Sequence, residues 1–443
     1  MSSEARRWFV SELAREDEDR HSGDLVAVRA RLDDGSCHAL CEAMITLRGS
    51  GDSDWGIYPQ AIIASPARIE ETGRKLETYA SSQSYGWGAH GVNVLARYGT
   101  DAAARILDDW HHKTRRDALR WRARRGVHQI AQSQGVSVEE LLERSLPTFD
   151  FDARGELEID FGSQRFTLRL GPLNAIGYVR DGKVMKSMPS KRVADDDELV
   201  TQAKAFIKRA RADIKRITRA QRRRFESAMF TGRSWEVSLW LERYARHPLM
   251  RSFIQGLVWG LCDAEGALVT PFQLDESYEL VDAKDDSVAW TEGQRVRIIH
   301  PIEMTPAQLS AWTERFMDFE IIESFPQLTR HAYKRDAWPE RGEALYMRLE
   351  RVPEKVFLGH LNRQGYQLGA REDAGLINAS TKQVGPYHIT ISHSGFSPEF
   401  EMGQDIELEG LDISMDGEPV TLDDLPDNAF SEVVGDLVSL TTP

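Results

Sequence analysis

Residues 201–225 read TQAKAFIKRARADIKRITRAQRRRF, and this stretch decides the fold of the chain. From Asp197 to Phe230 apolar residues recur at the spacing of one helix face, which predicts a single long helix. That face holds Ile207, Ala210, Ile214, Ile217, Phe225 and Met229. The chain then passes through GRSW at 232–235 into a second predicted helix. A third is predicted after HPL at 247–249, and it ends with LVW at 257–259.

The long helix is strongly basic. Over 204–224 it carries ten Lys and Arg residues against one acidic residue, Asp213. The ten are Lys204, Lys208, Arg209, Arg211, Lys215, Arg216, Arg219, Arg222, Arg223 and Arg224. Like charges four residues apart on a helix destabilise it by roughly 0.2–0.5 kcal/mol per pair. We therefore expect a negative partner for this surface.

Two kinds of negative partner are open. One is nucleic acid, whose phosphates attract Lys and Arg. The other lies within the chain, because residues 401–443 contain twelve Asp and Glu and no Lys or Arg. The whole chain has a formal net charge of −14, so pairing within the chain or with a partner protein is favoured over nucleic acid.

Length and composition set the outer limits. A chain of 443 residues with 41% hydrophobic content can form two or three domains with sizeable cores. Three cysteines without a framework spacing indicate a reducing compartment. No signal-peptide pattern and no run near the ~20 apolar residues of a membrane span is present, so we expect a cytoplasmic protein without a membrane partner. Cys37, His38 and Cys41 have no second ligand pair at zinc-site distance, and neither a metal nor a cofactor is expected.

Residues 1–147 are predicted to form a helical, repeat-like region. Helix-period apolar positions occur over 69–79, 92–98 and 102–110, and Ser137 has the position of a helix cap. The glycine-rich stretch 85–91 lacks the spacing of a phosphate-binding loop and is interpreted as a connection between helices.

A second basic segment runs from Lys113 to Arg125 and includes Trp121. A basic helix with an aromatic residue can follow a phosphate backbone. The favoured interpretation is a solvated helix face with Trp121 turned into the core.

Residues 148–443 are predicted to form one α+β domain. Alternating apolar residues separated by Gly-Ser, Gly-Pro and Asp-Gly pairs over 148–190 predict an antiparallel meander of four strands. The central helices follow over 197–260, and 261–443 form a mixed part that ends in the acidic tail. That part is predicted to contain a hairpin around 261–272, strands at 294–300, 387–393 and 406–413, a strand or extended turn at 320–328, and helices at 305–316, 354–364 and 427–440.

Several pieces of this domain together resemble one bacterial family, the molybdate metabolism regulator-like (MolR-like) proteins, which are built on a conserved domain of unknown function. The pieces are FGSQRF at 161–166, RFESAM at 224–229, GRSW at 232–235, HPL at 247–249, LVW at 257–259, IHP at 299–301, AW at 311–312, FPQL at 325–328 and SEVVGD at 431–436. Their order and spacing carry the resemblance, which covers about residue 100 to the end. Family members are usually longer, and some begin with a WGR domain, so this chain resembles a short form.

The resemblance implies a partner rather than a reaction. Genes of this family often lie beside a MoxR-type AAA+ ATPase and a von Willebrand factor A protein, which suggests a partner, substrate or scaffold of an ATPase system. The family brings no catalytic residues with it.

Two histidines are candidates for acid–base chemistry, His247 and His300. Glu242, Asp318 or Glu320 would have to complete such a group. Each histidine precedes a proline, which marks the boundary of an element, so a capping role is favoured. His360, His388 and His393 are metal-ligand types, but His388 and His393 are five residues apart in a predicted strand and point to opposite faces.

Taken together, the sequence favours a non-enzymatic interaction protein that recognises an acidic partner surface. The candidate interaction residues are Lys208, Arg209, Lys215, Arg216, Arg222, Arg223, Arg224, Trp235 and Trp259. The alternatives are a nucleic-acid-associated regulator, which would use Arg222–Arg224 and the 113–125 segment, and a hydrolase with a site near His247 and His300.

Overall fold

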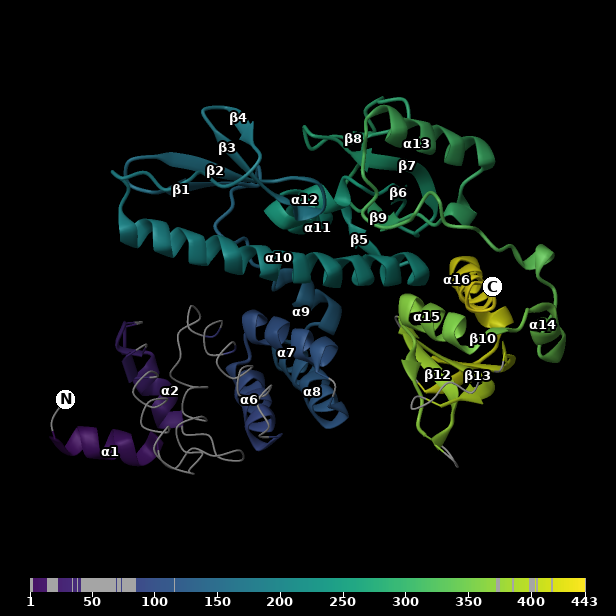
Figure 1. The fold of residues 1–443 in the computed structure, drawn as a ribbon, viewed down its shortest axis with the longest axis horizontal. Coiled ribbons are helices and arrows are strands. Elements are labelled where there is room, and N and C mark those ends of the chain that lie inside the picture. Colours follow the sequence, from purple (N-terminus) through teal and green to yellow (C-terminus); the bar gives the residue numbers. More distant parts are fainter. Residues whose placement is uncertain are drawn as a thin grey trace. The chain divides into compact units, whose positions relative to one another are not determined.

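The computed structural model contains two compact units, Met1–Pro147 and Thr148–Pro443 (Figure 1). The residues described are 3–13, 23–33, 35–37, 39–40, 69, 73, 85–114, 116–371, 375–384, 386–397, 403, 405–415 and 417–442. Helices and antiparallel sheets are both present, which confirms the predicted α+β class.

The first unit is helical wherever it is described. Its helices are α1 (Ser3–Leu13), α2 (Gly23–Arg29), α6 (Tyr85–Tyr98), α7 (Asp101–Lys113), α8 (Asp117–Gln134) and α9 (Val138–Arg144). Leu95, Leu107, Trp110, Ile130 and Leu141 lie in one apolar core of this unit. The Ser137 side chain accepts a hydrogen bond from the Glu140 amide, so the predicted cap is confirmed. The helix predicted over 69–79 falls almost entirely outside the described residues.

Two predictions for this unit are wrong. The glycine-rich stretch 85–91 is the first part of helix α6 and not a connection, because the helix incorporates the glycines. The Trp121 side chain is 60% exposed and does not turn into the core; Leu119, two residues earlier on α8, is the buried one. The guanidinium of Arg125, one turn further on, lies 5.4 Å from the centre of the Trp121 ring.

The second unit begins with the predicted meander. Strands β1 (Glu156–Asp160), β2 (Arg165–Leu170), β3 (Ile176–Arg180) and β4 (Lys183–Met185) pair in sequence order, each antiparallel to the next. The β3–β4 turn is Asp181-Gly182, with φ of 50° and 74°, so both residues adopt the left-handed conformation that a tight hairpin of this type requires. A short helical turn, η2 (Pro172–Asn174), joins β2 to β3.

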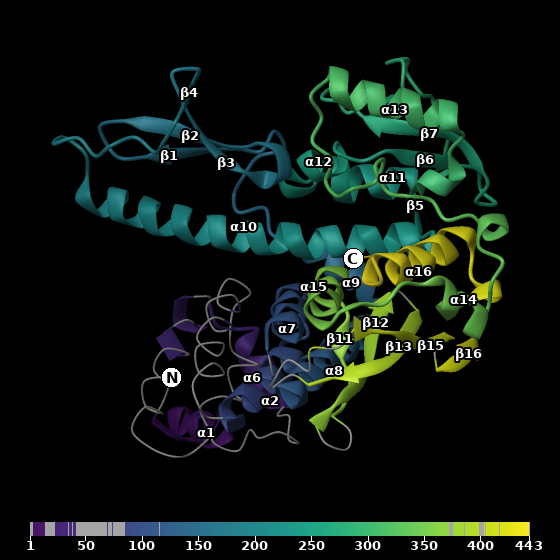
Figure 2. The same cartoon turned by 45° about the vertical axis from the view of Figure 1, so that its right-hand side comes forward.

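Helix α10 (Asp197–Thr231) is the long basic helix, and its predicted apolar face is the buried one. The Asp196 side chain accepts hydrogen bonds from the Glu198 and Leu199 amides at its start, and Gly232 ends it with φ 66°. The meander covers the first half of this helix in both views (Figures 1 and 2).

The second half of α10 packs against a five-stranded sheet in the order β5-β9-β6-β7-β8. Its strands are β5 (Ser234–Glu236), β6 (Trp259–Cys262), β7 (Leu268–Leu274), β8 (Leu280–Val281) and β9 (Arg295–Ile298). Three short elements join β5 to β6: α11 (Val237–Trp240), a π-helical turn η3 (Leu241–Ala245) and α12 (Pro248–Ile254).

The predicted third helix ending at Trp259 is therefore wrong in its second half. Helix α12 stops at Ile254, and Trp259 begins strand β6, where it pairs with Phe272 and Ile298. A short apolar run fits a buried strand as well as a helix, so the pattern alone could not decide. Gly256 shows why the chain turns here: a Cβ at this position would lie 2.4 Å from the Ile322 carbonyl oxygen, so only glycine allows the close approach.

The remaining elements confirm most of the predicted mixed part. They are η4 (Pro301–Glu303), α13 (Pro306–Asp318), η5 (Arg335–Ala337), α14 (Glu343–Arg348), β10 (Val352–Pro353), α15 (Glu354–Gln364), β11 (Gln367–Leu368), β12 (Ile377–Val384), β13 (Tyr387–Phe396), β14 (Asp405–Ile406), β15 (Leu408–Met415), β16 (Glu418–Val420), η7 (Leu422–Asp424) and α16 (Asp427–Leu440). Thr305 and Gln308 form a capping box at the start of α13. Residues 320–328 contain turns and bends and no strand, so of the two predicted alternatives the turn is the one observed.

The C-terminal sheet has the order β11-β12-β13-β15-β16, and helices α15 and α16 bury apolar side chains against it. His388 is exposed and His393 is buried on β13, so the prediction that they face opposite ways is confirmed. Burial lowers the pKa of His393 to about 4, which keeps this imidazole neutral near pH 7.

Phe225 on α10 provides a test of the packing between that helix and the central sheet. We expect Phe225→Ala to lower the free energy of unfolding by about 3–5 kcal/mol, because a buried aromatic side chain leaves a cavity that closes only partly. Urea denaturation followed by tryptophan fluorescence measures the change. Phe319→Ala is the matched control: that ring is 58% exposed, so we expect a loss below about 1 kcal/mol. Equal small losses in both variants would contradict the packing described.

Candidate functional site on the basic helix

Helix α10 presents its cations on the side opposite its buried stripe. Lys204, Lys208, Arg209, Arg211, Lys215, Arg219, Arg222 and Arg223 are exposed, while Arg216 and Arg224 are half-buried. All seven predicted interaction residues on this helix are therefore exposed or half-buried. The helical period explains this arrangement, because the positions between Ile207, Ile214 and Phe225 on the core face point outward.

Only part of this charge is compensated within the described chain. Arg216 pairs with Asp213 at 3.0 Å, and Arg222 lies 3.5 Å from Glu226. Arg211 donates a hydrogen bond of 2.7 Å to the Tyr178 hydroxyl, which is a neutral partner. Among the residues that the structure describes, five cations of the helix have no hydrogen-bond or ion-pair partner: Lys204, Lys208, Arg209, Lys215 and Arg219.

The acidic segment forms its described ion pairs with other cations. Asp423 binds Arg341 at 2.5 Å, Asp427 binds Arg335 at 2.8 Å, and Asp436 binds Lys382 at 2.6 Å. Glu407 pairs with Arg351 and Glu432 with Arg330. In these described ion pairs, the negative charge of the acidic segment is therefore balanced by arginines and a lysine that lie within residues 330–382.

A cleft of about 490 Å³ opens along the same helix, between α10, the η2 turn and α12. Its cationic wall comes from Arg211, Lys215, Arg219 and Arg222. Its other walls come from Leu173 to Ile176, Thr218, Phe253 and Ser324. Lys215 and Arg222 are among the interaction residues predicted from the sequence, but no sequence pattern indicates that a cavity lies beside them.

Asn174 fixes the shape of this cleft. Its side-chain amide donates to the Thr218 hydroxyl at 2.9 Å, and its carbonyl oxygen accepts from the Ser252 hydroxyl at 3.1 Å. Leu173 and Asn174 both have positive φ, 51° and 60°, so this turn is held in a left-handed conformation that Leu rarely adopts. The η2 turn is thereby fastened to both α10 and α12.

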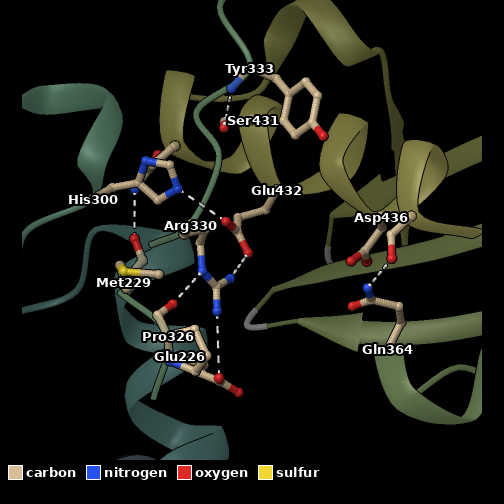
Figure 3. Close-up of polar contacts among 12 residues, drawn as sticks. Glu226, Met229, His300, Pro326, Arg330, Tyr333, Gln364, Ser431, Glu432 and Asp436 are labelled. Carbon is tan, nitrogen blue, oxygen red and sulfur yellow. Dashed lines mark hydrogen bonds and ion pairs between the residues drawn. The ribbon is translucent and has the colours of Figure 1, made fainter. Parts of the chain in front are cut away.

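A polar junction joins the far end of α10 to helix α16 (Figure 3). In it His300 is buried, and Glu226, Arg330 and Glu432 are half-buried. The Glu432 carboxylate accepts a hydrogen bond from His300 Nε2 at 3.0 Å and forms an ion pair with Arg330. Arg330 also lies 3.5 Å from Glu226 on α10 and donates to the Pro326 carbonyl at 3.1 Å. Residues from four separate segments therefore share one charge network.

The protonation of Glu432 follows from these contacts. Burial opposes ionisation and would raise the pKa of Glu432, but the hydrogen bond from His300 and the charge of Arg330 outweigh it, so the pKa lies below its ordinary value of 4.5. One helical turn further on, burial raises the pKa of Asp436, while the Lys382 ammonium opposes that change. The Tyr366 hydroxyl also donates to Asp436, at 3.3 Å.

The two acid–base candidates serve as helix caps. His300 is fully buried; its Nδ1 accepts from the Ile302 amide at 3.0 Å, so its proton is on Nε2 and points to Glu432. His247 Nδ1 accepts from the Leu249 amide at 3.2 Å at the start of α12. Both ring nitrogens of His300 are thus engaged and shielded from water.

The two tryptophans proposed for the interaction surface lie in the core. Trp235 is 4% exposed and Trp259 is completely buried. Their rings pack against Phe225 at 6.1 and 5.8 Å and against each other at 6.0 Å. Their role is to hold α10 on the central sheet, and the surface candidate set reduces to the cations.

Among the described residues, no group of three or more His, Cys, Asp or Glu side chains is arranged to hold a metal ion. Cys37 and Cys262 are buried. Cys41 lies outside the described residues. None of the described helices has the length and apolar character needed to cross a bilayer.

Comparison with known proteins finds similarity to a domain and to a protein for which no activity is given. Residues 182–366 match a domain of unknown function, DUF4132, and that range includes α10, His300 and Arg330. The chain is also similar to the uncharacterized protein YehI of Escherichia coli (strain K12), with 30% identity over 243 residues. That match covers 54% of this chain and 20% of YehI, so the chain spans about a fifth of the length of this relative. No solved structure matches the chain.

Glu432→Gln tests the polar junction. We expect the amide to lower the free energy of unfolding near neutral pH by about 2–3 kcal/mol, because it leaves the Arg330 charge with Glu226 alone. Above about pH 4.5, the ordinary pKa of glutamate in the unfolded chain, the ionised Glu432 carboxylate stabilises the fold. This stabilisation is lost as the pH falls through the lower pKa that Glu432 has in the folded protein. The difference from the wild type should therefore shrink below about pH 4.5.

Thermal denaturation of both proteins across this pH range measures the effect. Glu418→Gln on the exposed strand β16 is the matched control and should change the melting temperature little at any pH. A pH-independent difference for Glu432→Gln would show that the carboxylate charge is not what the junction uses.

Proposed function

We propose that this chain is a non-enzymatic interaction protein that binds an acidic surface of a partner protein through the exposed cations of helix α10. One observation carries the proposal: Lys204, Lys208, Arg209, Lys215 and Arg219 have no ionic partner among the described residues. They follow one another along one exposed side of a single helix. An acidic partner would relieve their mutual repulsion and would be steered towards them in solution.

The alternative of a hydrolase receives less support from the geometry. A general acid or base must reach the proton that it transfers. His300 is fully buried with both ring nitrogens engaged, and His247 uses Nδ1 to cap α12. A surface-recognition role needs neither group to be accessible.

The resemblance to MolR-like proteins suggests what the partner is. In that interpretation the protein acts in the cytoplasm as a partner, substrate or scaffold of a MoxR-type AAA+ ATPase, with a von Willebrand factor A protein in the same system. The free cations of α10 then supply the contact surface for one of these partners.

Nucleic acid is the second candidate, and one observation favours it. The 113–125 segment of the other unit exposes Trp121 with Arg125 stacked over it, together with exposed Arg116 and Arg124. Aromatic and basic side chains side by side are typical of single-stranded nucleic-acid binding. Such binding would weaken steeply as the salt concentration rises.

A pull-down from the native host separates the two candidates. The tagged wild type is compared with a variant that carries Lys204→Glu, Lys208→Glu, Lys215→Glu and Arg219→Glu, each with and without nuclease. We expect mass spectrometry to identify an AAA+ ATPase or a von Willebrand A protein with the wild type, and recovery to fall at least about tenfold with the variant.

The matched control reverses four exposed lysines elsewhere: Lys183→Glu, Lys186→Glu, Lys284→Glu and Lys355→Glu. It changes the net charge equally, and recovery of the partner should persist. Loss of every bound protein after nuclease treatment would overturn the proposal in favour of nucleic acid, and equal losses with both variants would remove α10 as the contact surface.

A further inference from the structure

The cleft beside α10 combines a row of cations with an apolar wall, and it is already rigid. We propose that it holds an extended acidic segment of the partner protein, which places carboxylates on the cations and inserts one apolar side chain between them. This inference rests on the proposed function and specifies the part of the partner that is recognised.

The spacing of the cations fits an extended peptide. Arg211, Lys215, Arg219 and Arg222 lie on successive turns of α10, so neighbouring cations are about 4.5–6 Å apart along the helix axis. In an extended chain every second side chain points the same way, with a repeat of about 6.6–6.8 Å. Acidic residues at alternate positions would therefore meet successive cations with small adjustments of the long Lys and Arg side chains.

The other wall of the cleft suits an apolar side chain. Leu173 is 39% exposed, Ile176 is half-buried, and Phe253 lies at the base with 1% exposure. A volume of about 490 Å³ lies within the range of about 300–1,000 Å³ that is typical of ligand pockets. Covering the Leu173 side chain would bury apolar surface that is now in contact with water.

The cleft needs little rearrangement to bind. Asn174 is hydrogen-bonded to both Thr218 and Ser252, and Arg211 is held by the Tyr178 hydroxyl while its guanidinium lies 5.9 Å from the centre of that ring. A site whose walls are fixed in advance loses less conformational entropy when a ligand enters.

A peptide fits these walls better than nucleic acid does. Single strands are bound by stacking bases on accessible aromatic rings, whereas the Phe253 ring is covered. Phosphate contacts would have no use for the apolar wall of Leu173 and Ile176.

Fluorescence anisotropy of a labelled synthetic peptide tests the inference. The peptide has Glu at four alternate positions, with Leu at the middle one of the three intervening positions and Ser at the other two. We expect it to bind the full chain, and Lys215→Glu with Arg219→Glu to weaken binding by at least about tenfold. Replacing the peptide's Leu with Ser should weaken binding about tenfold as well, because the apolar contact is lost.

Ala175→Trp supplies a variant that leaves the charge unchanged. Ala175 is exposed at the rim of the cleft, so the indole should obstruct it and reduce binding by a similar factor. Lys284→Glu with Lys355→Glu is the control of equal charge change and should bind as the wild type does. Unchanged melting temperatures show that each variant is folded.

The outcomes separate this inference from the proposed function. If Lys204→Glu with Lys208→Glu abolishes binding while the cleft variants bind normally, the proposed function stands and the cleft is not the binding site. If the peptide does not bind but a labelled oligothymidylate does, the proposed function and the inference about the cleft are both wrong. Equal affinity for the Leu and Ser peptides would overturn the apolar insertion.

Discussion

The packing of the Phe225 ring against four aromatic neighbours is the contact on which the second unit depends. Its ring centre lies 5.3 to 6.1 Å from those of Trp235, Tyr244, Phe253 and Trp259, which come from β5, the π-helical turn, α12 and β6. Edge-on and stacked pairs of this kind favour particular ring orientations. The cluster therefore fixes how α10 is rotated about its own axis, and that rotation decides which cations face the solvent.

The far end of α10 is fixed by charge instead of aromatic packing. Glu226, His300, Arg330 and Glu432 form a network in which the half-buried Glu432 carboxylate has both an imidazole and a guanidinium as partners. Removing charges from water costs solvation, so such a network adds less to stability than its short distances suggest. The network links α16 to α10, and the Asn428 amide adds a second link by donating to the Met229 carbonyl at 2.8 Å.

Local patterns in the sequence predicted the elements whose signals are local. The meander, α10, the capped helix α13 and the last helix all follow from periodicity, turn pairs or caps within a few residues. The failure at Trp259 occurred where a distant contact decides, because β7 and β9 pair with this residue. The FPQL and SEVVGD stretches likewise act through the Gln327 and Glu432 side chains, whose hydrogen-bond partners lie at least 28 residues away.

The candidate site shows the same difference between features that local sequence determines and features that distant contacts determine. Its charge could be counted from the sequence, because ten cations fall within one helix. Its shape could not, because Asn174 is 44 residues from Thr218 and 78 from Ser252, and no local pattern links them. A row of cations alone suits a carboxylate and a phosphate equally. The apolar wall and the covered Phe253 ring distinguish the two, so it is the fold around the helix, more than its charge, that favours an acidic protein segment as the ligand.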